Sequence, residues 1–248
     1  MSKLLEGSRC LVTGGSRGLG RAISLAFARH GARVAFTYRR DTASADETAR
    51  MLRDAGAPEP IVLQGTVTDS AHAKQAVDAV VSAWGAIDVL VNCAAVMQVL
   101  PISLLEEQDF DNVMAVNVKG VYLFSRAALR PMIRAKSGSI LNIGNFSSER
   151  VIEAPVHYAA SKSAVRGLTE ALAREVGRYG IRVNLLAPGM LDTGLALGMP
   201  QHRMREYIDQ CPMHRVGRAD EIAELAAFLV SSESSFISGA KIAADGGL

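Results

Sequence analysis

The sequence has 248 residues, of which 49% are hydrophobic and 21% are charged, and its formal net charge is +2. This composition excludes an intrinsically disordered chain, and the small net charge argues against a nucleic-acid partner. The three cysteines, Cys10, Cys93 and Cys211, lack the spacing of a disulfide framework or a zinc site, so we predict no metal and a reducing compartment, the cytoplasm.

Short apolar runs alternate along the chain with longer segments of helical periodicity. The apolar runs predict strands at residues 9–13, 33–38, 61–64, 87–92, 139–143, 181–186 and 241–244. The periodic segments predict helices at residues 20–30, 46–54, 71–84, 118–135, 157–179 and 220–230. Ser103 and Glu106 have the spacing of a capping box, so we expect a further helix to begin just after Pro101.

This alternation of strands and helices predicts the fold class. Parallel strands need crossover helices, so we expect an α/β fold with a doubly wound parallel sheet, Rossmann-like, of about seven strands with helices on both faces. No repeat, low-complexity tract or linker interrupts the pattern, which predicts one domain over residues 1–248. No apolar run reaches about 18 residues and the first residues lack a signal-peptide core, so we expect neither a membrane segment nor export.

A glycine-rich segment follows the first predicted strand. Gly14, Gly18 and Gly20 stand in Thr-Gly-Gly-Ser-Arg-Gly-Leu-Gly, between that strand and the first helix. Glycines there permit a tight turn and let backbone N–H groups approach a pyrophosphate at the helix N-terminus. The segment therefore predicts a dinucleotide site, and the alternative is a plain strand–helix turn.

The end of the second predicted strand indicates which dinucleotide is bound. An NAD site usually has an acidic residue there to bind the ribose 2′-hydroxyl, but the sequence reads Tyr38-Arg39-Arg40, with Asp41 only beyond. Arg17 of the glycine segment projects toward the same region. Two guanidinium groups suit a 2′-phosphate, so we predict NADP, although both could be ordinary surface arginines.

Two residues of one predicted helix form a candidate catalytic pair. Tyr158 and Lys162 are four residues apart and so share a helical face. A ketone that accepts a hydride must also accept a proton, which a phenol can donate. Because the pKa of a free tyrosine is about 10, a nearby lysine cation would help by stabilising the phenolate.

The ordered set of these motifs resembles the short-chain dehydrogenase/reductase family over essentially the whole chain, and most of all the branch of bacterial 3-oxoacyl-[acyl-carrier-protein] reductases. Besides the glycine segment and the Tyr158–Lys162 pair, Asn117 in Met-Ala-Val-Asn-Val-Lys-Gly matches the family's helix asparagine. The segment Asn-Leu-Leu-Ala-Pro-Gly, followed by Thr193, matches the part that covers the nicotinamide. The C-terminal part, from Gly217 to Gly247, also fits.

The resemblance implies a role for each matching residue. The catalytic residues would be Asn117, Tyr158 and Lys162, with Asn117 supporting a proton-conducting water and Lys162 also binding the nicotinamide ribose. The NADP contacts would come from Gly14, Ser16, Arg17, Gly18, Leu19, Gly20, Arg39, Thr66, Val67, Asn92, Tyr158, Lys162, Pro188, Gly189 and Thr193.

The residue that polarises the substrate carbonyl departs from the family pattern. The family has a serine thirteen residues before the tyrosine, where this chain has Asn145. An asparagine amide can donate to a carbonyl oxygen, so we expect Asn145 to be the donor. Ser147 is the alternative, but it lies two residues and about 6.6 Å farther along if the strand continues.

The segment after the fourth predicted strand departs as well. It reads Asn92-Cys93-Ala94-Ala95 where the family has Asn-Asn-Ala-Gly. The methyl group of Ala95 would hinder close approach of the backbone to the cofactor. We expect Cys93 to be a buried small residue with no redox role, because nothing near it in the sequence would activate its thiol.

Two function classes follow. The first is an NADPH-dependent reductase that converts a ketone to a secondary alcohol, on an acyl or other hydrophobic substrate, either free or carried on an acyl carrier protein. The second is a catalytically weak NADP-binding protein that acts as a partner or regulatory subunit.

The segment from Met190 to Pro212 would supply either an apolar lid over the substrate or a helix packed on the domain. The resemblance also implies a homotetramer in which the helices of Asn117 and Tyr158 form one interface.

Overall fold

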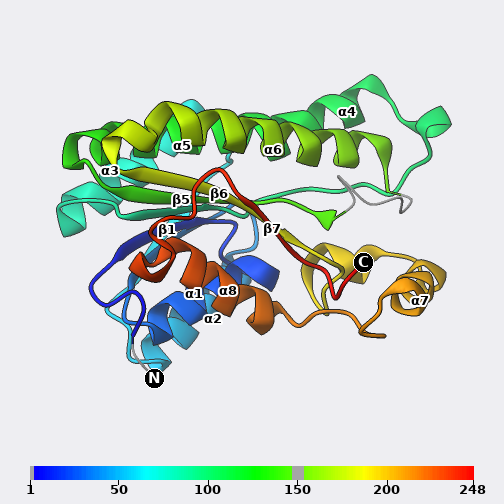
Figure 1. Cartoon of the computed structure of the whole chain (residues 1–248), viewed down its shortest axis with the longest axis horizontal. Helices are drawn as coiled ribbons and strands as arrows, with labels where there is room; N and C mark the ends of the chain where they lie inside the picture. Colours follow the sequence, from blue (N-terminus) through cyan, green and yellow to red (C-terminus); the bar gives the residue numbers. More distant parts are fainter. Residues whose placement is uncertain (1–2, 147–153) are drawn as a thin grey trace.

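The computed structural model describes residues 3–146 and 154–248, and it is built around one parallel β-sheet (Figure 1). The seven strands have the spatial order β3-β2-β1-β4-β5-β6-β7, and all neighbouring strands are parallel. The strands are β1 (Arg9–Thr13), β2 (Arg33–Tyr38), β3 (Ile61–Gln64), β4 (Val89–Asn92), β5 (Gly138–Ile143), β6 (Ile181–Pro188) and β7 (Lys241–Ala244). The predicted doubly wound, Rossmann-like α/β fold is confirmed.

Helices cover both faces of the sheet (Figure 1). One face carries α1 (Gly18–Arg29), α2 (Thr42–Asp54) and α8 (Ala219–Val230), and the other carries α3 (Ser70–Trp84), α5 (Gly120–Ala135) and α6 (Val156–Val176). Two shorter helices, α4 (Glu107–Met114) and α7 (Gln201–Gln210), lie beyond the carboxyl ends of the strands. None of the described helices is both long and apolar enough to cross a membrane.

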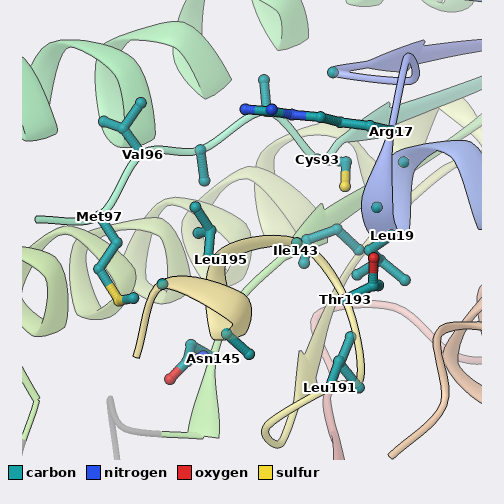
Figure 2. Close-up of a pocket in the computed structure, with 18 of the residues that line it drawn as sticks. Arg17, Leu19, Cys93, Val96, Met97, Ile143, Asn145, Leu191, Thr193 and Leu195 are labelled. Carbon is teal, nitrogen blue, oxygen red and sulfur yellow. The ribbon is translucent and has the colours of Figure 1, made fainter. Parts of the chain in front are cut away.

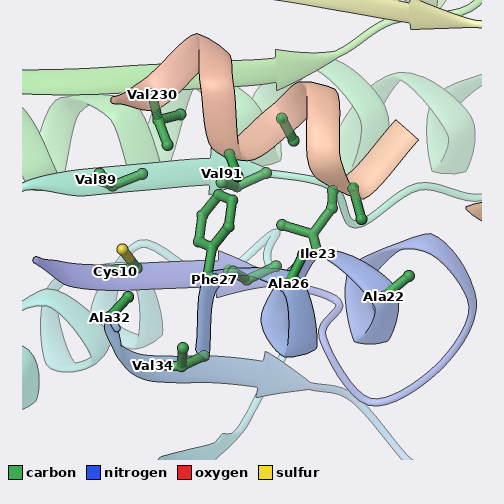
Figure 3. Packing of buried hydrophobic residues seen from close by; sticks show 14 of the residues in the cluster. Cys10, Ala22, Ile23, Ala26, Phe27, Ala32, Val34, Val89, Val91 and Val230 are labelled. Atoms are coloured by element: carbon green, nitrogen blue, oxygen red, sulfur yellow. The ribbon is translucent and has the colours of Figure 1, made fainter. Parts of the chain in front are cut away.

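The apolar strand residues divide between two cores, one on each face. On the α1–α8 side, Phe27 is fully buried among Cys10, Val91 and Val230 (Figure 3). On the other side, Phe124 of α5 is fully buried in a second cluster with side chains of β1, β4 and α3. The strands are buried on both faces because helices cover both, which explains their continuous apolar runs.

The helix that was expected to begin just after Pro101 starts later in the structure. Ser103 does not begin an α-helix; it lies in the short 3-10 helix Ile102–Leu104. The helix starts at Glu107 instead, where Glu106 and Asp109 form the capping box. The prediction was wrong because a Ser-x-x-Glu pattern fits several local turns, and here the acidic pair Glu106 and Asp109 satisfies the free N–H groups.

A second difference concerns the helix that carries Asn117. The predicted helix 118–135 is preceded by a π-helical turn, Ala115–Lys119, which places Asn117 in a widened turn directly after α4. Such turns are rare and are frequent at functional sites. Helix α2 also begins before its predicted start, at Thr42, because Asp41 accepts a hydrogen bond from the backbone N–H of Ser44 at 3.0 Å.

Candidate active site

The candidate site is a cavity of about 1210 Å³ at the carboxyl ends of the strands. The chain leaves β1 toward β2 on one side and reaches β4 on the other, so a crevice forms between the loops that follow β1 and β4. Side chains from the phosphate loop, the loop after β4, the end of β5 and the segment after β6 converge there (Figure 2).

Most of the predicted site residues line this one cavity. They are Gly14, Ser16, Arg17, Gly18, Leu19, Gly20, Arg39, Thr66, Val67, Asn145, Tyr158, Lys162, Pro188, Gly189 and Thr193. Ser147, the alternative carbonyl donor, lies outside the described residues.

Asn92 and Asn117 lie beside the cavity, with their side chains bonded to protein groups. Asn92 Nδ2 donates to Ser125 Oγ at 3.1 Å and to Asn142 Oδ1 at 2.8 Å. Asn117 Oδ1 accepts from the Val96 backbone N–H at 2.8 Å, and its Nδ2 donates to the Val96 carbonyl at 2.9 Å. Asn117 therefore fixes the loop after β4, which forms one wall of the cavity.

The phosphate loop has the shape that a pyrophosphate requires. A Cβ atom on Gly20 would lie 2.2 Å from the Gly14 carbonyl oxygen, so only glycine lets the start of α1 approach the end of β1. Helix α1 has no side-chain cap and no acidic residue in its first turn. Its first N–H groups and its positive dipole end are therefore available to an anion, which fits a dinucleotide phosphate.

The other end of the cofactor cavity is positively charged. Arg17, Arg39 and Arg40 are exposed, line the cavity, and form no ion pair within the described part of the chain. Asp41 is the nearby acid, but its carboxylate caps α2 and accepts from Ser44 N at 3.0 Å and Ser44 Oγ at 2.7 Å. These hydrogen bonds lower the pKa of Asp41, so its carboxylate stays ionised and remains bonded to Ser44.

Tyr158 and Lys162 lie in α6 on the opposite wall. Both are almost fully buried, and Lys162 Nζ lies 5.6 Å from the centre of the Tyr158 ring. Lys162 Nζ donates to the Ile143 carbonyl at 2.8 Å, which ties α6 to the end of β5. Ser161 supports this arrangement, because its hydroxyl donates to the Tyr158 carbonyl at 2.7 Å and accepts from Asn117 Nδ2 at 3.0 Å.

Burial shifts both titrating groups away from their charged forms. It lowers the pKa of Lys162 to about 8 and raises the pKa of Tyr158 well above its usual value. Around neutral pH the pair is therefore a protonated phenol beside a protonated amine. That state is ready to donate a proton and to stabilise the phenolate left behind.

Cys93 was expected to be buried, but it is partly exposed and lines the cavity beside Lys162 (Figure 2). Burial of the thiol still raises the pKa of Cys93 to about 11, so it is not activated as a nucleophile. Cys93, Met97 and Phe146 all line the cavity, although none of them was predicted as a site residue. Their only sequence signal is that each lies just beyond a strand that ends at the crevice.

The segment after β6 closes over the phosphate loop. A Cβ on Gly18 would lie 3.2 Å from Gly194 Cα, so the two backbones are nearly in contact. The following 3-10 helix, Gly194–Gly198, brings Leu195 to the cavity (Figure 2). Leu197 of the same helix also lines it, but is 71% exposed. Of the predicted apolar lid, Leu195, Leu197, Met199 and Tyr207 line the cavity, but Arg203, Glu206 and Gln210 of α7 line it too.

Comparisons with known proteins agree with this geometry. A family model described as enoyl-(acyl carrier protein) reductase matches residues 14–248. The chain is 36% identical to the 3-oxoacyl-[acyl-carrier-protein] reductase FabG of Thermotoga maritima, covering 98% of each chain, and 34% identical to human (3R)-3-hydroxyacyl-CoA dehydrogenase, covering 98% of this chain and 96% of that one. A short-chain dehydrogenase from Burkholderia cenocepacia, crystallised with NADP, has a TM-score of 0.91 at 36% identity, covering 98% of each chain.

The Lys162 pKa near 8 predicts how ketone reduction depends on pH. Below this value the ammonium is charged and would assist proton donation from Tyr158; above it the charge is lost. We expect kcat/KM for the reduced cofactor, which reports groups of the free enzyme, to be level at low pH and to fall as the pH rises through about 8. A pH series measured by cofactor absorbance checks this, and a level profile from neutral pH to well above 8 would contradict it.

Proposed function

The chain belongs to the short-chain dehydrogenase/reductase family, oxidoreductases that interconvert CH–OH and C=O groups, and we propose that it uses NADPH to reduce a ketone to a secondary alcohol, with Asn145 polarising the carbonyl. The observation that carries this proposal is the convergence of Tyr158, Lys162 and Asn145 on the cavity that also contains the phosphate loop. A proton donor, a cation and a carbonyl-binding group thus share one space with the candidate cofactor site.

The chain's own residues manage the proton and the developing charge. NADPH, when bound, supplies a hydride to the carbonyl carbon, and the C=O bonding pair moves onto oxygen. Tyr158 then donates its hydroxyl proton to that oxygen and becomes a phenolate. Lys162 stabilises the phenolate because its ammonium is buried nearby, where a charge interaction is weakly screened. Asn117 holds the facing loop and Ser161, which keeps α6 in register with the site.

Asn145 is positioned to act as the carbonyl donor. It follows the last residues of β5 and lines the cavity together with Tyr158 and Ile143 (Figure 2). A side-chain amide donates a hydrogen bond as a serine hydroxyl does, and such a bond strengthens as negative charge grows on the substrate oxygen. Asn145 can therefore supply the same hydrogen bond as the family's serine.

The preference for NADP rests on charge. Arg17 and Arg39 carry no ion-pair partner in the described ranges, and both line the adenosine end of the cavity. A 2′-phosphate would neutralise them, and bidentate guanidinium–phosphate contacts are among the stronger charge-assisted hydrogen bonds. The 2′-hydroxyl of NAD would instead need an acceptor, and Asp41 is already used in capping α2.

The substrate is best described as hydrophobic or acyl. Met97, Leu195 and Met199 line the same cavity as Asn145, and methionine side chains adapt to several shapes. The two relatives described above carry names that refer to acyl substrates on a carrier protein or on CoA. We propose that this chain also takes an acyl ketone, either free or carried on an acyl carrier protein.

A second candidate function is that of a cofactor-binding partner subunit with little turnover. It is favoured by Ala95 and Asn145, which stand where the family has glycine and serine, and which both line the cavity. One assay with a ketone panel that includes acyl thioesters distinguishes the two functions. A reductase would reduce at least one member of the panel, whereas a partner subunit would bind NADPH tightly and reduce none.

We also propose a homotetramer in which α5 and α6 form one interface. Tyr122 on α5 and Val156 on α6 are large apolar residues that are about half exposed, at 49% and 50%. Phe236, just before the edge strand β7, is fully exposed, at 103%. Apolar side chains exposed in this way are typical of surfaces that a second copy covers.

Arg39→Ala tests the cofactor preference. Titration calorimetry should give at least tenfold tighter binding of NADPH than of NADH to the wild type, and the substitution should narrow this gap because one phosphate contact is lost. Arg33→Ala is the matched control, since Arg33 is an exposed arginine at the start of β2, and Arg39 directly follows the end of that strand. Equal affinities of the wild type for the two cofactors would overturn the assignment.

Substitutions of Asn145 test the carbonyl donor. Asn145→Ala should lower kcat by roughly ten- to a thousandfold, the range for one lost oxyanion donor, and should leave the Kd for NADPH unchanged. Asn145→Ser should keep or raise activity, and Ser147→Ala should be nearly silent. Steady-state kinetics with one ketone would reject this assignment if Ser147→Ala were inactive while Asn145→Ala remained active.

The mass in solution tests the assembly. Light scattering at micromolar concentration should give four times the chain mass of 26.4 kDa. Tyr122→Asp should reduce that mass, because it would place a charge in the α5–α6 interface. A wild-type peak at the chain mass itself would show that the proposed interface does not form.

A further inference from the structure

Tyr207 attaches the lid helix α7 to the carboxyl ends of the strands. It is 3% exposed and is the one buried residue of α7, a helix that the structure describes in full. The other apolar residues of α7, Met204 and Ile208, are only partly buried, and Ile208 packs against the same small cluster as Tyr207. Tyr207 is therefore the main buried anchor of this helix.

Three strand ends contact the Tyr207 side chain. Its ring packs edge-on against Phe146, just after β5, with 5.4 Å between ring centroids and 70° between the planes. Its hydroxyl donates to the carbonyl of Asp245, just after β7, at 3.1 Å. A Cβ on Gly189, just after β6, would lie 2.1 Å from this hydroxyl, so glycine leaves the space that the hydroxyl fills.

These contacts reach the carbonyl site through one peptide unit. Phe146 directly follows Asn145 in the sequence, and both line the cavity with Tyr207. Phe146 is 8% exposed and belongs to a small apolar cluster with Tyr207 and Cys211. Fixing the Phe146 ring fixes the backbone from which the Asn145 amide projects.

We propose that Tyr207 is a positioning residue that holds Asn145 at the carbonyl oxygen and, through the same contacts, seats α7 over the substrate end of the cavity. The inference rests on the proposed function, because it gives Tyr207 its effect through Asn145. Burial raises the pKa of Tyr207 to about 12, so its hydroxyl remains a donor throughout the working range of the enzyme.

Tyr207→Phe removes the hydrogen bond to Asp245 and keeps the ring. A small displacement of a catalytic group can cost about a hundredfold in rate, so we expect kcat to fall about ten- to a hundredfold and KM for the ketone to rise. The Kd for NADPH should not change, because the phosphate loop and the arginines are unaffected. Tyr179→Phe makes the same chemical change at a half-buried tyrosine outside the cavity and should have no effect with a small ketone.

A double-substitution cycle separates this inference from the proposed function. If Tyr207 acts through Asn145, adding Tyr207→Phe to Asn145→Ala should not lower kcat further, since the group that Tyr207 positions is already gone. If the two substitutions lowered kcat by factors that multiply in the double variant, the inference would be overturned while the proposed role of Asn145 stood. The same would hold if Tyr207→Phe left kcat unchanged while Asn145→Ala lowered it. Wild-type activity in Asn145→Ala would overturn the proposed role of Asn145, and the inference with it.

Hydrogen exchange gives a readout that needs no turnover. In Tyr207→Phe, mass spectrometry should show at least tenfold faster exchange both in α7 and in the peptide that contains Asn145 and Phe146. Exchange in the phosphate loop should be unchanged. Faster exchange confined to α7 would mean that Tyr207 holds the lid without reaching the carbonyl site, and would overturn the proposal.

Discussion

The order of the strands around β1 is the constraint on which the rest of the site depends. Because β1 lies between β2 and β4, the chain winds outward in both directions from it, and the loops after β1 and β4 separate at the carboxyl edge. That separation opens the crevice, directs the N-terminus of α1 into it, and brings the end of β5 and the start of α6 to its far wall. Residues more than a hundred positions apart in the sequence therefore line the same crevice.

The candidate site combines an exposed, positively charged part with a buried pair of titrating groups. At the proposed adenosine end, the arginines are exposed, so binding an anion there would cost little desolvation. At the reacting end, Tyr158 and Lys162 are buried at about 5% exposure or less, and burial disfavours both of their charged forms. The positive charge that develops on the nicotinamide during reduction would offset part of that cost for the phenolate. Because the pair is buried, the charge on the cofactor would have a large effect on the ionisation of Tyr158 and Lys162.

Much of this arrangement could be predicted from the sequence because it depends on local patterns. Apolar runs of strand length located the seven strands, and most of the site residues predicted from the motifs line the cavity. The failures came where two local patterns compete or where the structure depends on contacts between distant segments. The capping pattern at Ser103 lost to a competing acidic pair, and the exposure of Cys93 follows from the crevice rather than from its neighbours in sequence. The contact between Phe146 and Tyr207 has no sequence signal, because neither residue belongs to a motif.

In the proposed reaction, NADPH transfers a hydride to a carbonyl carbon and Tyr158 donates a proton to the carbonyl oxygen. The most direct measurement uses NADPH deuterated at the transferable position and a panel of ketones and acyl thioesters, with mass spectrometry of the alcohol formed. The account predicts one deuterium on the carbinol carbon for the wild type, and little product from Tyr158→Phe with its NADPH affinity retained. Unlabelled alcohol, or undiminished turnover in Tyr158→Phe, would contradict it.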